Sequence, residues 1–414
     1  MTTKNKVEYT ALKAANRAYD SIMDAGLKVM DPWLKTFIAD TTFGAGSVKK
    51  LPDVLKKAEI HHPLLVTDPG VEQAQLTPIL NNLNASGFEV SVYDKIEENP
   101  TVESIEEARK QYLKDQCDGL IGLGGGSSMD AAKAIGARVV KKWQPITKMG
   151  GLFRVLKYIP PMVAIPTTAG TGSEVTMGAV VSDHKKQRKY ALMDPFIMPK
   201  YAIMDPELSV SLNPFYTATT GMDALTHAVE SYVTWGWNTN ESNRNAEDAI
   251  VKIFRYLEKA YNDGSDIEAR DQMLLASYQA GLAFNRTAVG YVHAIAHNIA
   301  GIYNTPHGAT NAVLLPIVLE EYGAAVEDRL AHLAEITGVK DTGSNRDKSR
   351  AFIAEIRAMN RRMNIPTGLP YLEEKNFDRI AKLAMKEAFS FYPSPVVFSK
   401  EEIRHILNRA LLEA

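Results

Sequence analysis

Residues 118–130 read Asp-Gly-Leu-Ile-Gly-Leu-Gly-Gly-Gly-Ser-Ser-Met-Asp, and a helical pattern follows over 131–140. The short apolar run is typical of a strand buried on both faces of a sheet. Glycines at 124–126 let backbone amides approach an anion, and the N-terminus of the next helix adds its dipole. We therefore predict a strand that ends in a pyrophosphate cradle. The alternative is a glycine-rich turn without a ligand, since Ser127 occupies the third glycine place of GxGxxG.

The same alternation continues on both sides of this stretch. Apolar strands are expected at 64–68, 88–93 and 161–166, with helical runs between them. A loop rich in hydroxyl groups follows the last of these strands, at Thr167, Thr168, Thr171 and Ser173. Asp68 ends the first, where its carboxylate could accept hydrogen bonds from a ribose diol or, alternatively, cap a helix. Strands alternating with helices predict a mainly parallel sheet with binding loops at its carboxyl edge.

The strand signals stop near Asn213-Pro214. Successive helices are expected beyond that point, at 215–234, 244–262, 267–283, 288–303, 310–323, 325–336, 346–363, 375–388 and 400–413. We therefore predict a helical extension over 1–33, an α/β dinucleotide-binding domain over 34–212, and an all-helical metal-binding domain over 213–414. A cleft should separate the last two.

Histidines are concentrated between Gly290 and Gly308, which reads GYVHAIAHNIAGIYNTPHG. His293 and His297 stand at i and i+4, so a helix would place both on one face. His307 follows a predicted turn, and Asp223 and His227 form another i, i+4 pair. Carboxylate and imidazole together suit Zn²⁺ or Fe²⁺. These five candidates exceed the usual four ligands, and their spacing does not say which one has another role. The alternative is that the histidines are ordinary core or capping residues that bind no metal.

Net charge, apolar runs and cysteine content argue against a nucleic-acid-binding, membrane-spanning or disulfide-linked protein. A net charge of −2 over 414 residues gives no bulk electrostatic attraction to nucleic acid or an anionic membrane. No run approaches the about 20 apolar residues of a membrane span. A single cysteine, Cys117, excludes an internal disulfide and is typical of the reducing cytoplasm. We therefore expect a cytoplasmic globular protein.

The N-terminal segment is predicted to be an amphipathic helix that ends near Asp31-Pro32. Apolar residues recur at helical spacing among charged ones, namely Val7, Leu12, Ala15, Tyr19, Ile22, Leu27 and Met30. We expect this helix to pack on its own subunit or on a neighbouring one; docking on a membrane surface or a partner is the alternative.

Taken together, four stretches resemble the iron-dependent (group III) alcohol dehydrogenase family. They are Gly124–Asp130, Pro166–Glu174, Gly221–His227 and His293–His307, and the resemblance extends from about Phe37 to the C-terminus. The family implies an N-terminal dinucleotide-binding domain, a C-terminal helical domain, one divalent metal in the cleft, and a homo-oligomer. It also implies NAD(H) as cofactor and a small alcohol or aldehyde as substrate. Fe²⁺ is the metal that the family implies, and Zn²⁺ is the alternative.

The resemblance also assigns roles to individual residues. The implied metal ligands are Asp223, His227, His293 and His307, and His297 is left near the reacting oxygen as a proton relay. The implied cofactor residues are Asp68, Asn99, Gly125, Gly126, Ser127, Ser128, Thr167, Thr168, Lys189 and Leu208. Phe284 matches an aromatic residue that lines the substrate pocket.

The chain departs from the family pattern at the N-terminal extension, at Asn298, at Ser390–Pro395, and at Arg286. The extension lies outside the shared core, so we expect it to be dispensable for turnover and to act in assembly or in association with a partner. Arg286 stands two residues after Phe284, where a guanidinium could bind an anionic substrate tail. The alternative for Arg286 is a surface or subunit contact.

These features favour hydride transfer between an alcohol carbon and a nicotinamide, with the metal polarising the oxygen. Asp68 predicts NAD(H) over NADP(H), because its charge would repel a 2′-phosphate and no arginine follows closely. Related architectures with zinc glycerol dehydrogenase or dehydroquinate synthase chemistry are the alternatives. A metal- or nucleotide-binding protein without activity is a third, which the density of site motifs disfavours.

Overall fold

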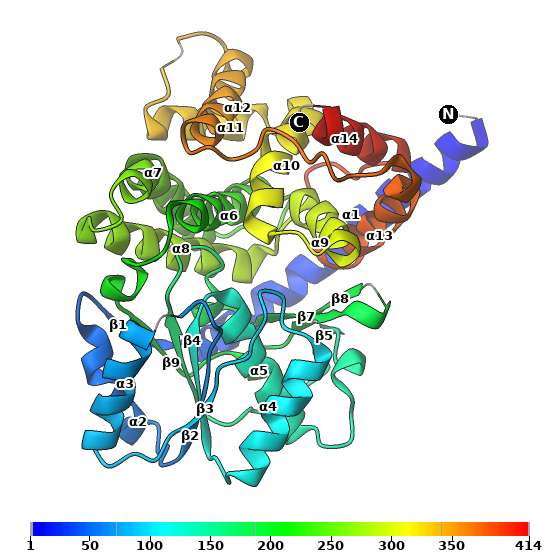
Figure 1. The fold of residues 1–414 in the computed structure, drawn as a ribbon. Helices are drawn as coiled ribbons and strands as arrows, with labels where there is room; N and C mark the ends of the chain where they lie inside the picture. The colour runs from blue at the N-terminus through cyan, green and yellow to red at the C-terminus, as the bar shows by residue number, and fades with distance from the viewer. Residues whose placement is uncertain (1–2, 72, 187, 341, 413–414) are drawn as a thin grey trace.

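The computed structural model describes residues 3–71, 73–186, 188–340 and 342–412, with side chains from residue 13 onward. Figure 1 shows two halves, one built around a twisted sheet and the other entirely of helices. This arrangement confirms the predicted fold class of a parallel α/β half followed by an all-helical half.

The main sheet has six strands in the order β1-β9-β6-β4-β2-β3, and its pairs are all parallel. These strands are β1 (Asp40–Phe43), β2 (Pro63–Val66), β3 (Ser91–Tyr93), β4 (Gly119–Gly124), β6 (Met162–Pro166) and β9 (Tyr201–Met204). Four helices accompany the sheet, namely α2 (Leu51–Lys57), α3 (Gln73–Ala85), α4 (Val102–Lys114) and α5 (Gly126–Val140).

An apolar core lies on each face of this sheet. In β4, Leu120 belongs to one core while Ile121 and Leu123 belong to the other. Met162 and Val163 of β6 divide in the same way. Because successive side chains of a strand point to opposite faces, a strand covered on both sides must be apolar throughout. This burial explains the uninterrupted apolar run at 119–124.

Five strands were not predicted. The edge strand β1 is short and polar, and β9 has only four residues, although Pro199 before it and Asp205-Pro206 after it are turn signals that could have marked it. A second sheet in the order β5-β8-β7 is formed by β5 (Gly151–Leu152), β7 (Gly178–Asp183) and β8 (Arg188–Met193). The pair β7 and β8 is antiparallel and mostly half-buried, so it lacks the apolar runs that identify the central strands.

The helical half contains nine α-helices among the described residues, matching the predicted series closely. They are α6 (Pro214–Val233), α7 (Asn240–Asn262), α8 (Ile267–Thr287), α9 (Tyr291–Tyr303), α10 (His307–Tyr322), α11 (Glu327–Thr337), α12 (Asn345–Arg362), α13 (Phe377–Phe391) and α14 (Lys400–Leu412). The Asn213 side chain caps α6, and Pro214 occupies its first turn. Within the described ranges, no helix combines the length and apolar character needed to cross a membrane.

The N-terminal helix α1 spans Thr3–Leu34, so the predicted end near Asp31-Pro32 is slightly early. The predicted apolar stripe is also only partly correct. The side chains of Val7 and Leu12 lie outside the described ones, and Ala15 and Ile22 are exposed. Asn16 and Asp20 are instead buried, at 2% and 1% exposed. The helix packs on its own subunit through a partly polar face.

Helices α6 and α10 approach each other closely at a glycine. A Cβ atom built on Gly308 would lie 2.4 Å from the carbonyl oxygen of Thr219 and 3.5 Å from the Cβ of Asp223. Because the nearest group is backbone, it cannot rotate away, so the contact depends on glycine at this position.

We predict that Gly308→Ala lowers the thermal unfolding midpoint, because overpacking at a rigid contact costs about 1–3 kcal/mol. Gly26→Ala is the matched control, since nothing lies within 4 Å of its added Cβ. Alanine in that exposed helical position should leave the midpoint unchanged or raise it slightly. Equal midpoints for Gly308→Ala and the unmodified protein would contradict the packing argument.

Candidate metal and dinucleotide site

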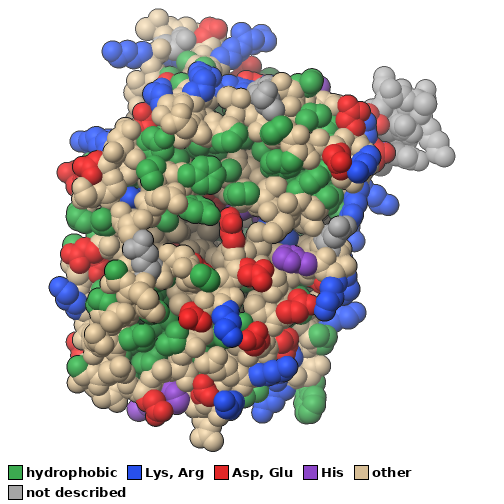
Figure 2. All heavy atoms as spheres, viewed as in Figure 1, with side chains coloured by type: hydrophobic (Ala, Val, Ile, Leu, Met, Phe, Trp, Pro, Cys, Tyr) green, Lys and Arg blue, Asp and Glu red, His purple; other side chains and the backbone are tan. Residues whose placement is uncertain are grey.

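A cavity of about 930 Å³ lies between the two halves. Figure 2 shows one face of the molecule hollowed where the halves meet, with acidic side chains around the hollow. The predicted site residues that line the cavity are Asp68, Asn99, Gly125, Gly126, Ser127, Thr167, Thr168, Lys189, Leu208, Asp223, His227, Phe284, His293, His297 and His307. The predicted metal ligands and the predicted cofactor residues therefore line the same cavity.

On the α/β side, the candidates follow the ends of neighbouring strands. Asp68 follows β2, the Gly125–Gly126 turn follows β4, Thr167 and Thr168 follow β6, and Leu208 follows β9. These strands are adjacent in the sheet and parallel, so their carboxyl ends form one row. Ligands of open α/β sheets bind along this edge.

The glycine turn has the geometry of an anion cradle. Gly125 is the N-cap residue of α5 and offers no side-chain cap, so no capping side chain satisfies the first amides of that helix. Gly124 has a φ of +142°, which favours glycine. A Cβ on Gly126 would lie 2.5 Å from the Cγ2 of Thr171, so the hydroxyl-rich loop closes on the turn only if glycine is present.

Asp68 is held in place by two hydrogen bonds. Its Oδ2 accepts from the Ser128 hydroxyl at 2.6 Å, and its Oδ1 accepts from the Gly70 amide at 2.9 Å. Ser128 is fully buried beneath the turn rather than on the cavity wall. Its side chain therefore fixes the carboxylate, while the Ser127 hydroxyl donates to the carbonyl of Glu98.

A polar chain at Lys189 connects the two halves. Lys189 Nζ donates to Asn99 Oδ1 at 2.7 Å, and Asn99 Nδ2 donates to Asn304 Oδ1 at 3.0 Å. Burial lowers the pKa of Lys189 to about 8. Lys189 comes from the small sheet and Asn304 caps α9, so the contact joins the cofactor side to a histidine-bearing helix.

A second buried network lies beneath the cradle and was not predicted. Lys133 Nζ donates to Ser173 Oγ at 2.8 Å, and Ser173 Oγ donates to Asp130 Oδ1 at 2.7 Å. The other Asp130 oxygen accepts from the Val180 amide. Desolvation lowers the pKa of Lys133 to about 8. The network fixes α5 against the hydroxyl-rich loop and β7, which sequence spacing alone does not reveal.

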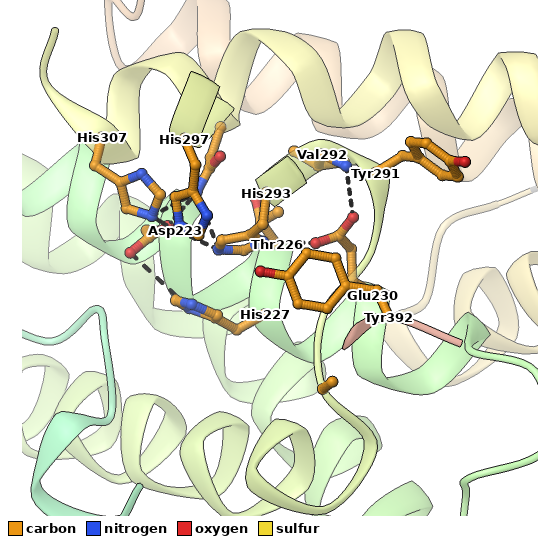
Figure 3. Close-up of polar contacts among 12 residues, drawn as sticks. Asp223, Thr226, His227, Glu230, Tyr291, Val292, His293, His297, His307 and Tyr392 are labelled. Atoms are coloured by element: carbon orange, nitrogen blue, oxygen red, sulfur yellow. Dashed lines mark hydrogen bonds and ion pairs between the residues drawn. The ribbon is translucent and has the colours of Figure 1, made fainter. Parts of the chain in front are cut away.

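On the helical side, Asp223, His293 and His307 converge from α6, α9 and α10 (Figure 3). One ligand atom of each lies within 4.8 Å of the others. Asp223 Oδ1 lies 3.8 Å from His293 Nε2 and 3.6 Å from His307 Nε2. A carboxylate and two imidazole nitrogens therefore face one point.

Asn311 shows which ring nitrogens are free to accept. Its Nδ2 donates to Asp223 Oδ1 at 2.7 Å and lies 3.2 Å from His293 Nε2 and 3.1 Å from His307 Nε2. Burial lowers the pKa of His293 to about 3 and that of His307 well below its usual value. Both rings are thus neutral, which is the state that binds a metal. The two hydrogens of the Asn311 amide can serve at most two of its three neighbours. The donor set fits a divalent cation.

His227 lies beside this group rather than within it. Its Nδ1 is 3.9 Å from Asp223 Oδ2, and its ring stacks on Phe284 at a centroid distance of 4.4 Å. Desolvation lowers the pKa of His227 to about 4, and Nδ1 is buried without a hydrogen-bond partner. An orphaned imidazole nitrogen at this position is available to a cation.

Glu230 orients His293 and was missed by the sequence analysis. His293 Nδ1 donates to Glu230 Oε2 at 2.5 Å, and the Val292 amide donates to Oε1 at 2.7 Å (Figure 3). This bond leaves His293 Nε2 free to face Asp223. The signal was present, because positions 223, 227 and 230 share one face of a helix.

His297 is held from behind by a glutamate on α13. Its Nδ1 lies 2.7 Å from Glu387 Oε1, which also accepts from the Tyr392 hydroxyl at 2.8 Å. Asn298 donates to the other Glu387 oxygen at 3.0 Å. The His297 ring stacks on His307 at 5.2 Å. The structure thus places His297 at the edge of the cluster, oriented by a residue 90 positions away.

Arg286 is occupied by the N-terminal helix. Its guanidinium lies 3.6 Å from Asp24 and 3.3 Å from Asp31, and only 9% of the side chain is exposed. Of the two roles considered for Arg286, these ion pairs favour a packing contact over a binding site for an anionic substrate tail.

Comparisons with known proteins agree with this geometry. The profile described as "Iron-containing alcohol dehydrogenase" matches residues 39–206, and the profile "Fe-containing alcohol dehydrogenase family, C-terminal" matches residues 217–411. NAD-dependent methanol dehydrogenase of Bacillus methanolicus is 36% identical over 90% of this chain and 98% of its own. 1,3-Propanediol dehydrogenase of Klebsiella pneumoniae is 36% identical over 84% and 90%.

A solved structure of 1,3-propanediol oxidoreductase superposes with a TM-score of 0.86 at 33% identity, covering 90% of this chain and 98% of that one. Both halves are matched in order, and the converging acid and imidazoles lie in the half that the second profile covers. This chain therefore belongs to the iron-containing alcohol dehydrogenase family.

Proposed function

We propose that this protein is a metal-dependent, NAD-linked alcohol dehydrogenase that interconverts a small primary alcohol and its aldehyde. One observation carries the proposal: an acid–imidazole cluster and a strand-edge anion cradle face the same cavity. Hydride transfer assisted by a metal requires both components in one space. The names of the relatives support the reaction class.

We assign one divalent metal to Asp223, His227, His293 and His307, with Fe²⁺ favoured by the family name and Zn²⁺ as the alternative. When bound, the metal would polarise the substrate oxygen while the nicotinamide accepts or supplies hydride. Glu230 holds the tautomer of His293 that presents Nε2. Asn311 holds the Asp223 carboxylate by a 2.7 Å hydrogen bond.

His297 is assigned as the proton relay. Glu387 engages its Nδ1, so Nε2 is the atom that takes up or returns the hydroxyl proton. Phe284 covers the His227 ring and lines the cavity, where it excludes water from the reacting oxygen.

The row of strand ends is assigned to NAD(H). The Gly125–Ser128 turn would receive the pyrophosphate, with Thr167 and Thr168 beside it, and Leu208 would form part of the adenosine wall. Asp68 would accept from the ribose diol, while Asn99 and Lys189 stand on the side of the cavity nearer α9. Each assigned group except the Ser128 side chain lines the cavity.

We further propose that residues 34–212 and 213–414 act as separate cofactor and metal domains in a cytoplasmic homo-oligomer. The lone Cys117 supports the location, since it is buried and leaves no partner for an internal disulfide. The assembly rests on the family resemblance and is measured by light scattering after size-exclusion chromatography.

The direct test of the proposed function is a panel of aldehydes and alcohols on metal-reconstituted protein with each nicotinamide cofactor. We expect stoichiometric NADH oxidation with a short-chain aldehyde. The absence of turnover with every member of the panel, on protein that retains its metal, would overturn the proposal.

We predict that His307→Ala loses metal and activity together, because three ligands leave an open, weak site. His297→Ala is the matched variant and should retain its metal while losing about 10²–10⁴-fold in turnover, the usual contribution of a positioned acid or base. Metal content is measured by atomic emission on dialysed protein. Full occupancy in His307→Ala, or metal loss in His297→Ala, would show that ligand and relay have been exchanged.

We predict a preference for NAD(H) that Asp68→Gly relaxes by improving NADP(H) binding. Coulomb repulsion between unit charges at about 4 Å is roughly 4 kcal/mol at an effective dielectric of 20. A third of that, after screening, is about a tenfold preference in binding. Asp94→Gly, which removes an exposed acid at the end of β3, is the control. The dissociation constants of NADPH and NADH are measured by fluorescence for each variant. If their ratio is unchanged in Asp68→Gly, another residue must discriminate between the two cofactors.

A further inference from the structure

Helix α1 precedes both regions that the family profiles match. It docks on a strip formed by the last turn of α13 and the residues after it. Arg17 Nη1 donates to the Ser394 carbonyl at 2.9 Å, and the Tyr19 hydroxyl donates to the Ser390 carbonyl at 3.1 Å. The Arg17 guanidinium also lies 4.3 Å from the centroid of the Trp235 ring. The strip is the Ser390–Pro395 segment, where the chain departs from the family pattern. Two departures that are far apart in sequence therefore meet in space.

Another of the four departures, Arg286, meets the same helix. Its guanidinium lies between Asp24 and Asp31, which stand two helical turns apart on α1. The Arg286 side chain is only 9% exposed, and a buried guanidinium needs counter-charges, which the two carboxylates of α1 supply. Arg286 stands two residues after Phe284, whose ring stacks on His227. The ion pairs thus fix α1 to the helix end that carries the aromatic residue beside the metal cluster.

The opposite end of α1 is fixed to the α/β half. The Trp33 ring contacts Phe37 and Phe196 at centroid distances of 4.8 and 6.0 Å. In the middle of the helix, Trp237 Nε1 donates to the carbonyl of Asp20 at 3.0 Å. Figure 1 shows α1 running from the N-terminus near α13 and α14 toward the α/β half. The helix therefore spans the junction between the halves.

Two apolar side chains of α1 reach the cavity between these attachment points. Met23 and Leu27 stand at i and i+4, and both line the cavity wall together with Trp237, Ala288 and Phe391. Leu27 is 9% exposed. Tyr392, next to Phe391, bonds Glu387, which in turn engages His297. These connections place the α1 wall on the His297 side of the cavity, away from Asp68 at the cofactor edge.

We infer that α1 is the outer wall of the substrate pocket and that Met23 and Leu27 set the length of the aldehyde that the enzyme accepts. The inference rests on the proposed function and specifies its substrate class as uncharged, unbranched aliphatic aldehydes. The wall is apolar where Met23 and Leu27 face the cavity. Arg286 also lines the cavity, and its guanidinium lies 3.6 Å from the Asp24 carboxylate and 3.3 Å from that of Asp31. Two carboxylates beside one guanidinium leave no net positive charge, so an anionic tail would gain nothing at this wall.

The test compares kcat/KM for linear aldehydes from propanal to octanal with NADH as the reductant. Met23→Ala and Leu27→Ala should raise the ratio of long-chain to short-chain efficiency by about tenfold, the scale of a few methylenes in an apolar pocket. Leu27→Phe should lower the same ratio, because it fills the wall. Ile22→Ala and Val29→Ala are matched controls on the same helix, with side chains 72% and 83% exposed, and they should leave the ratio unchanged.

A second readout does not depend on turnover. The dissociation constant of hexanamide, an unreactive analogue, is measured by calorimetry on the enzyme saturated with NADH. This dissociation constant should change in the Leu27 and Met23 variants but not in the Ile22 or Val29 variants. If an alanine variant fails to fold, Leu27→Phe decides the matter. Identical chain-length ratios in all variants would overturn the inference, whereas the absence of aldehyde reduction by the unmodified enzyme would overturn the proposed function instead.

Discussion

The buried carboxylate of Asp223 is the group on which the arrangement of the helical half depends. Asp223 is only 3% exposed and is surrounded by neutral imidazoles. Its carboxylate accepts a hydrogen bond from Asn311. A charge in such surroundings is costly unless a cation or several donors compensate it. Helices α9 and α10, which bring the imidazoles and Asn311 to this carboxylate, must therefore approach α6 closely. Gly308 permits that approach, since any Cβ there would meet the Thr219 carbonyl.

The turn between α9 and α10 serves the same geometry. Asn304 ends α9 in the left-handed region at φ 49°, and His307 then begins α10 after Pro306. The chain reverses within a few residues, so His307 returns to the face that carries His293. Spacing in the sequence predicted this return, because Pro306 cannot continue a helix and the histidine follows it directly. The local sequence was therefore sufficient to predict the position of His307.

Contacts between distant segments were not predictable in this way. Glu387 engages His297 across 90 positions, and its only sequence signal is an acid in an ordinary amphipathic helix. Asn311 lies one turn after His307, yet nothing in its neighbours distinguishes an amide that faces the metal ligands from one that faces solvent. Periodicity reports which side of an element is buried, not which group it meets. The central strands and the helices were predictable because burial alone determines them.

Helix α1 illustrates the opposite error, in which periodicity indicated the wrong face. Apolar spacing favoured Ala15 and Ile22, but the buried positions include Asn16 and Asp20. Polar contacts of neighbouring positions hold this helix in place: Arg17 donates to the Ser394 carbonyl, and Asp24 lies beside the guanidinium of Arg286. They bury Asn16 Oδ1 and Asp20 Oδ2 without a hydrogen-bond partner. Such contacts are directional, so they fix the rotation of the helix about its axis more tightly than apolar packing does.

The same contacts bear on how the two halves move. Asn99 bonds Asn304 across the cleft, and α1 is attached to Arg286 on one side and to Phe196 on the other. A hinge between two domains requires that few contacts cross it. Here the junction carries several contacts besides the Asn99–Asn304 bond and α1. The Met177 amide donates to Asn285 at 2.8 Å, the Gly172 amide donates to Ser277 at 3.2 Å, and the Phe43 ring contacts that of Tyr278. Helix α8 is thus joined directly to loops and a strand of the α/β half, and any opening of the cleft would have to break these hydrogen bonds as well as the attachments of α1.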